Sequence, residues 1–256
     1  MTKLTDQGER KMRRTIIAIL CLTTLTTLAI PHKIAEEIHA AAKKEWSHDL
    51  SMQLWEEKKE TEAWNDLQTF EFPTLMKGII AEAIKTAVQK QWKKNYSMQI
   101  WEIKNEVSAW EEIQIFKFPP TMISVIAEKV KAAAEQKWAN RYSMQIWEIK
   151  NEVNAWEDLH TFKFPTSMTR AISEEIKLAV KEKKYEKYST QLWNLKNEVR
   201  DWLALQKFLF PDLMPRTVVY KIQTLAKKKW PKNYSIQLRE VKNEVNAWLK
   251  RYPDAR

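Results

Sequence analysis

Apolar residues recur every three or four positions along the stretch from Thr74 to about Lys93. The set consists of Met76, Ile80, Ile84, Ala87 and Val88. Residues with this spacing share one face of an α-helix. We therefore predict an amphipathic helix over this stretch. Pro73 precedes it, and proline suits the start of a helix but cannot continue the previous one.

A second helix is predicted from Met98 to about Phe116. Successive residues of a helix turn by about 100°, which gathers its apolar positions on one arc: Ile100, Ile103, Val107 and Trp110. Ser97 precedes the run, so its hydroxyl is expected to cap the helix by accepting a hydrogen bond from an unpaired amide. Tyr96 and Trp101 would then have the spacing of a hydrophobic staple.

The whole helix pair is repeated along the chain. The string from Ser97 to Pro119 recurs with small changes, starting at Ser51, Ser143, Ser189 and Ser235, always 46 residues apart. A fixed period of this length is the signature of a repeat array. We expect an all-α protein in which about five two-helix units, residues 30–256, stack as one α-solenoid. In general plan this resembles HEAT and tetratricopeptide arrays.

The first 29 residues differ from the rest. Lys11, Arg13 and Arg14 precede a run, residues 15–30, that is apolar or threonine almost throughout. With Thr27 and Ala29 before a cleavage point, this is the layout of a signal peptide. We predict secretion, or a periplasmic location, if Met1–Ala29 is removed, and an intracellular soluble protein otherwise. The alternatives are a degenerate capping helix and an uncleaved anchor.

Composition supports an ordered helical protein and limits its chemistry. Two glycines are too few for an α/β enzyme with phosphate-binding loops, and 30% charged with 44% hydrophobic residues argues against disorder. The net charge is +10, but acidic and basic residues alternate along most of the predicted helices, so the excess does not form a single basic tail. Cys21 is the only cysteine, so an intramolecular disulfide or a cysteine-based zinc site cannot form.

One stripe of the second helix has no assigned role in the core. It carries Trp101, Lys104, Asn105 and Ser108, and its counterparts are Trp147, Lys150, Asn151 and Asn154, then Trp193, Lys196, Asn197 and Arg200. The tryptophan either packs on a neighbouring repeat or stands on a polar face where it can stack on a ligand. We favour packing, because Arg239 replaces it in the last copy and terminal repeats exchange apolar for polar surface.

Two binding functions follow from these patterns. In the first, the stripe holds an extended protein partner through its tryptophans and asparagines and through one lysine per copy: Lys58, Lys104, Lys150, Lys196 and Lys242. In the alternative, a basic and aromatic edge binds nucleic acid, an anionic membrane surface or another polyanion. That edge comprises Lys93, Lys94, Tyr96, Arg141, Tyr142, Lys187, Tyr188, Lys228, Lys229, Lys232 and Tyr234.

Catalytic chemistry is not predicted. The four histidines do not recur in register, and the chain has no nucleophile elbow, HExxH, P-loop or GxGxxG string. Glu102 and Glu106 lie one turn apart, which could indicate an acid and base pair, but with Lys104 between them we interpret them as surface charge. We therefore expect no enzyme activity, cofactor, metal or small-molecule substrate.

Overall fold

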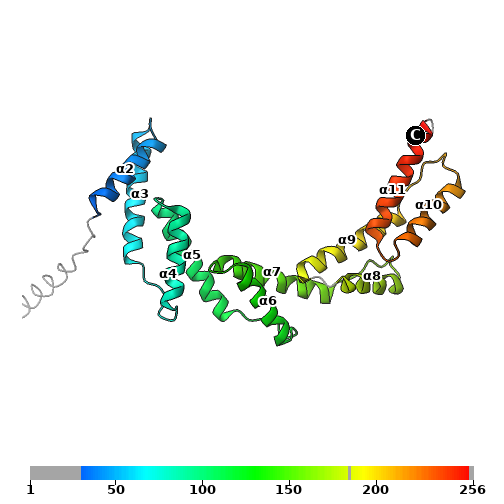
Figure 1. The fold of residues 1–256 in the computed structure, drawn as a ribbon, viewed down its shortest axis with the longest axis horizontal. Helices are drawn as coiled ribbons and strands as arrows, with labels where there is room; N and C mark the ends of the chain where they lie inside the picture. Colours follow the sequence, from blue (N-terminus) through cyan, green and yellow to red (C-terminus); the bar gives the residue numbers. More distant parts are fainter. Residues whose placement is uncertain (1–29, 184–185, 254–256) are drawn as a thin grey trace, which may run out of the picture. The chain divides into compact units, whose positions relative to one another are not determined.

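The structure, a computed structural model, describes residues 30–183 and 186–253. Within these ranges the chain forms ten α-helices and no β-strand (Figure 1). The helices are α2 (His32–Glu45), α3 (Leu50–Thr69), α4 (Gly78–Trp92), α5 (Tyr96–Ile115), α6 (Ser124–Lys137), α7 (Tyr142–Thr161), α8 (Arg170–Glu182), α9 (Tyr188–Gln206), α10 (Arg216–Lys229) and α11 (Tyr234–Arg251).

The chain divides into two compact units. Unit 1 comprises Met1–Glu111 with Asn140–Ser143, and unit 2 comprises Glu112–Ala139 with Met144–Arg256. In unit 1, α2 packs against α3. In unit 2, α8 packs against α9, α10 against α11, and the two second helices α9 and α11 against each other. Packed neighbouring helices of this kind are consistent with a helical repeat.

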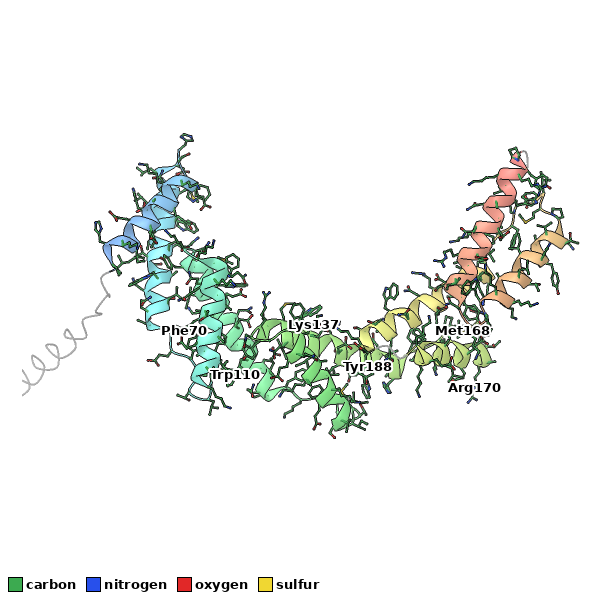
Figure 2. All side chains as sticks on the ribbon, viewed as in Figure 1. Phe70, Trp110, Lys137, Met168, Arg170 and Tyr188 are labelled. Atoms are coloured by element: carbon green, nitrogen blue, oxygen red, sulfur yellow. The ribbon has the colours of Figure 1, made fainter. Side chains whose placement is uncertain are left out.

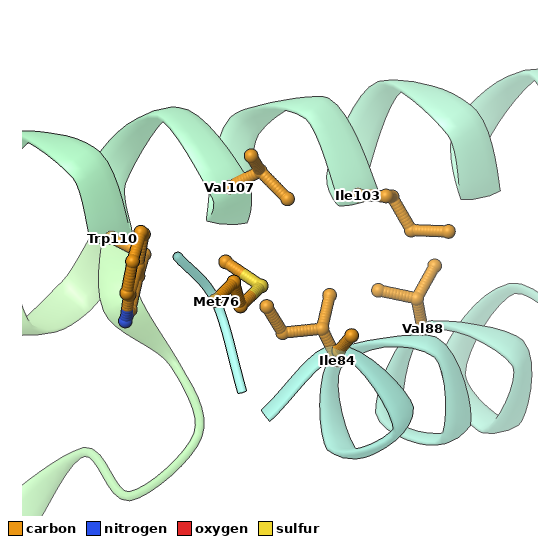
Figure 3. Packing of buried hydrophobic residues seen from close by; sticks show 7 residues of the cluster. Met76, Ile84, Val88, Ile103, Val107 and Trp110 are labelled. Atoms are coloured by element: carbon orange, nitrogen blue, oxygen red, sulfur yellow. The ribbon is translucent and has the colours of Figure 1, made fainter. Parts of the chain in front are cut away.

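Three helix pairs, α4–α5, α8–α9 and α10–α11, each enclose an apolar core. Between α4 and α5 the core contains Ile84 and Val88 from the first helix and Ile103, Val107 and Trp110 from the second (Figure 3). The predicted core residues of the second helix are thus confirmed. The counterparts Trp156 and Trp202 are also buried, whereas Trp64 and Trp248 are half-buried.

The first helices begin later than predicted. We expected a helix from Thr74, but α4 begins at Gly78. Between them the Met76 amide donates to the Pro73 carbonyl over 2.8 Å, which closes a turn, and the same turn follows Pro119, Pro165 and Pro211. The Met76 side chain enters the core from this turn. Its helical spacing from Ile80 was therefore misleading, because a turn residue reaches the same core.

The caps of the second helices were also predicted wrongly. Helix α5 begins at Tyr96, and the side chain of Asn95, rather than that of Ser97, accepts from the Met98 amide over 2.9 Å. Asp49 and Asn233 cap α3 and α11 in the same way. Ser97 therefore lies inside the first turn.

The predicted hydrophobic staple does not form, because Tyr96 is the first residue of its helix rather than the residue before the cap. The tyrosines at this position point towards the preceding helix pair. Tyr142 packs on the α4–α5 core and Tyr234 on the α8–α9 core. Tyr188 lies at the start of α9 (Figure 2), where its amide donates to Glu152 of the preceding pair. The tyrosine thus joins one helix pair to the next.

The predicted signal peptide, residues 1–29, lies outside the described residues. In the part of the chain that is described, no helix combines the length and the apolar character needed to cross a membrane.

Candidate functional site

Four tryptophans on the second helices are open to solvent. Their exposed fractions are 53% for Trp55, 56% for Trp101, 54% for Trp147 and 65% for Trp193. Large aromatic side chains normally bury most of their surface. The same position therefore leaves an indole exposed in α3, α5, α7 and α9.

The prediction that these tryptophans pack on a neighbouring repeat is wrong. At two of the joints between helix pairs, the contact with the preceding core is made instead by the tyrosine that begins the second helix, Tyr142 or Tyr234. The residue at the position of Ile100 is buried in α5, α7, α9 and α11. Trp101 follows the buried Ile100 directly, so it lies about 100° around the helix from that residue. Arg239 in α11 is therefore not the replacement of a packed residue, because the tryptophans it matches are exposed.

An asparagine accompanies each of three exposed tryptophans, one helical turn further on. Asn105 and Asn151 are exposed and Asn197 is half-buried, and none of the three side chains hydrogen-bonds to another described residue. Residues four positions apart are neighbours on a helix surface. We call these three pairs the tryptophan–asparagine face: Trp101 and Asn105, Trp147 and Asn151, Trp193 and Asn197.

In unit 2 the face is hollowed on both sides of Trp193. One hollow, of about 290 Å³, lies between α7 and α9 and is lined by Asn151, Asn154 and Lys196 as well as by Trp193. The other, of about 370 Å³, includes Asn197 and reaches the start of α11. The indole of Trp193 therefore separates two open depressions whose walls carry amide groups.

Three of the stripe lysines form ion pairs with acidic side chains of the same chain. Lys104 Nζ lies 3.2 Å from Asp66, Lys196 Nζ lies 3.4 Å from Asp158, and Lys150 makes the corresponding pair with Glu112. For Lys242 in the last copy, the position that corresponds to Asp66 as the partner is occupied by Ala204, which is uncharged. Because the ion pairs are about half exposed, each contributes little to stability. They neutralise the stripe, which leaves the tryptophans and asparagines as its distinctive groups.

The tyrosines of the basic and aromatic edge are partly buried. Burial raises the pKa of Tyr96 and of Tyr188, and nearby glutamates add to the effect. Three of the lysines are also engaged, since Lys94 lies 3.2 Å from Glu37, Lys187 donates to Glu148, and Lys229 donates to Glu240 over 2.7 Å. Lys93, Arg141 and Lys232 are exposed. The exposed cations of this edge are therefore accompanied by aromatic rings that are partly buried.

A row of buried glutamates was missed in the sequence. Glu60, Glu106, Glu152 and Glu198 expose at most 6% of their surface. Glu60 accepts from the Tyr96 amide over 2.6 Å and from the Ser97 amide over 3.2 Å, and Glu198 does the same for α11. Glu106 and Glu152 also accept from the hydroxyls of Ser143 and Ser189. Each carboxylate thus satisfies amides that no helical carbonyl can reach.

Our interpretation of Glu102 and Glu106 as surface charge is therefore wrong. Both are buried. Burial raises the pKa of Glu102, and the neighbouring charge of Glu106 raises it further. Glu148, the counterpart of Glu102, is also buried, but hydrogen bonds from Lys187, Lys137 and Trp138 outweigh that burial and hold its pKa below the ordinary value.

One signal in the sequence could have indicated the buried glutamates. Glutamate occupies this position in all five copies, at Glu60, Glu106, Glu152, Glu198 and Glu244. A glutamine is equally constant at the position of Gln145, whose side chain donates to the Trp138 carbonyl over 3.0 Å and so closes the preceding first helix. A polar residue kept in every copy indicates a repeated contact, which four of the five glutamates make here.

A comparison with protein-family models, curated proteins and solved structures finds no match to this chain. Across residues 30–183 and 186–253, no group of three or more histidine, cysteine, aspartate or glutamate side chains is placed to hold a metal ion.

Proposed function

We propose that the 46-residue units stack as an α-solenoid, and that the chain is a non-enzymatic scaffold that holds an extended protein partner along its second helices. The observation that carries this proposal is the tryptophan–asparagine face. On α5, α7 and α9 it repeats an exposed indole beside a side-chain amide that hydrogen-bonds to no other described residue.

The chemistry of the two side chains matches an extended peptide. An asparagine amide offers both donors and an acceptor, so it can pair with the N–H and C=O groups of a peptide backbone. An exposed indole offers a flat apolar surface for a side chain or a proline ring, and tryptophan is among the residues that contribute most to binding energy. A ligand that is extended leaves its backbone groups free for such pairing.

A polyanion is the alternative partner. It would use the exposed cations Lys93, Arg141 and Lys232, but the tyrosines of that edge are partly buried and so offer less surface for stacking on bases. The two partner classes differ in their response to salt, because phosphate contacts make affinity fall steeply as salt rises.

The test is to select short, proline-containing peptides that bind the full chain and to measure their affinity by titration. Proline keeps the peptides from folding as helices. We expect Trp147→Ala and Trp193→Ala each to weaken binding about thirtyfold, because a binding hot spot contributes about 2 kcal/mol. Helix content, followed by circular dichroism, should remain that of the wild type.

Leu178→Ala is the matched control. Leu178 is 52% exposed, close to Trp147, but lies on the first helix α8 away from the face, and this change should leave affinity unaltered. Failure to select any peptide, or equal affinity of the tryptophan variants and wild type, would refute the proposal. Tight binding of a single-stranded oligonucleotide with a steep salt dependence would support the polyanion alternative instead.

A further inference from the structure

The joint between consecutive helix pairs has a donating half and a receiving half. The donating half is the start of a second helix, which supplies two free amides, a tyrosine ring and an apolar residue four positions later. The receiving half is the preceding pair, which supplies a buried glutamate and an apolar core. In the α8–α9 pair these are Glu198 and the core that holds Tyr234.

Among the described residues, the start of α3 is a donating half without a partner. Leu50 occupies the tyrosine position and is 69% exposed. Leu54 is 58% exposed, although its counterparts in the other four copies are buried: Ile100, Ile146, Leu192 and Leu238. No described residue hydrogen-bonds to the Leu50 or Ser51 amide in the way that Glu60 holds Tyr96.

Helices α10 and α11 carry a receiving half that no other described helix fills. Glu244 is exposed, unlike its four buried counterparts, and the core of this pair contains no tyrosine from another helix among the described residues. Beside Glu244 lies a groove of about 1060 Å³, lined by Ile222, Leu225, Ala226 and Trp248. The carboxylate and the apolar floor of the groove are therefore both present, but no described helix packs against them as α11 packs against the α8–α9 pair.

We propose that these two halves join between molecules: α3 of one copy docks on the α10–α11 groove of a second copy, so that the chain associates head to tail. Leu50 and Leu54 enter the groove, and Glu244 accepts from the Leu50 and Ser51 amides. The partner is a second copy because the same contact already joins neighbouring pairs within this chain. A joint between two different surfaces lets assembly continue beyond a dimer. This docking does not depend on peptide binding.

One charge at the joint opposes association and gives a sharp test. Within the chain, the stripe lysine meets an acidic residue of the preceding pair, as Lys104 meets Asp66. At the proposed joint Lys58 would meet Lys250, which occupies the position of Asp66 in the last copy. Association should therefore strengthen as salt screens this repulsion. Lys58→Glu should strengthen association further, because the new carboxylate could form an ion pair with Lys250. The two charges would then be exchanged relative to Lys104 and Asp66.

The experiment is sedimentation velocity with the full chain over a range of protein concentrations. The wild type should form dimers and longer species as concentration rises. Leu54→Lys and Glu244→Lys should each weaken association at least about tenfold, which corresponds to about 1.4 kcal/mol. Both positions are exposed in the single chain, so these variants should fold. Leu178→Lys, a change at an exposed leucine away from both halves, is the control and should behave as the wild type.

A mixture of the two variants distinguishes head-to-tail docking from a symmetric dimer. Leu54→Lys keeps a working groove and Glu244→Lys keeps a working α3, so the mixture should form dimers but nothing larger. A wild type that stays monomeric at every concentration would overturn the inference, as would variants that associate like the wild type or a mixture that forms no dimer.

Discussion

At the scale of single residues, the tyrosine that begins four of the five second helices has a structural role. The Tyr234 ring packs on the α8–α9 core, its amide donates to Glu198, and its hydroxyl donates to Glu175 over 3.1 Å. A phenol with an apolar body and a polar tip suits such a boundary position. The rings that the sequence offered for stacking on a ligand are therefore part of the joints between helix pairs.

This role makes a prediction about alkaline pH. Burial raises the pKa of Tyr234 to about 12, and Glu175 adds to the shift. Because the folded pKa exceeds the ordinary value of 10.0, the protonated phenol favours the folded state. Its contribution to stability should be complete below pH 10 and should disappear as pH rises towards 12.

The phenolate absorbance of wild type and Tyr234→Phe, followed against pH, measures this pKa. The difference between the two curves should show a transition at about pH 12. A difference curve centred at 10.0, the ordinary value, would show that the phenol is not shielded in solution.

At the scale of helices, a buried carboxylate of the preceding pair accepts from the first amides of α5, α7, α9 and α11. Glu152 accepts from the amides of Tyr188 and Ser189 and from the Ser189 hydroxyl. These amides lie at the positive end of the helix dipole, where an anion is stabilising. The glutamate thus links two helices through residues that are 36 positions apart in sequence.

Glu152→Ala should lower the free energy of unfolding by about 2 to 3 kcal/mol, because hydrogen bonds to a charged group are lost and two amides are left unsatisfied. Glu244→Ala removes the same residue from a copy in which it is exposed, and should cost less than about 0.5 kcal/mol. Urea denaturation of both variants measures the difference. Similar losses for the two would contradict the proposed role.

The helix pairs and their cores could be predicted from the sequence, but the starts of the second helices could not. The periodicity of Ile103, Val107 and Trp110 is a local signal, and the structure places all three in the core. Asn95 and Ser97, in contrast, are both good helix caps. The choice between them is consistent with the position of Glu60, whose contact with Tyr96 spans 36 residues and leaves no trace in a local pattern.

The exposure of the tryptophans is a second feature that local sequence patterns could not predict. Trp101 lies beside the buried arc of α5, so a small difference in how consecutive pairs meet would have covered it. The sequence identified the stripe that carries Trp101 and Asn105 but could not determine whether the indole was buried, because that depends on the packing of a neighbouring helix pair. The structure leaves the indole exposed.

At the scale of the whole molecule, the tryptophans of the second helices fall into two sets by position. Trp156 and Trp202 are buried in the cores, whereas Trp147 and Trp193 lie on the tryptophan–asparagine face. The net charge of +10 says less about the class of partner, because many lysines are paired with acidic side chains. The distinctive surface is therefore aromatic and amide-rich, which favours a protein partner.

The most direct test of the proposed function is an NMR titration that follows the indole N–H signals of the full chain as a selected proline-containing peptide is added. We expect the signals of Trp147 and Trp193 to shift in proportion to the peptide bound, while those of Trp156 and Trp202 stay in place. Binding that moves only the buried indoles, or that leaves Trp147 and Trp193 unchanged at saturation, would contradict the proposed function.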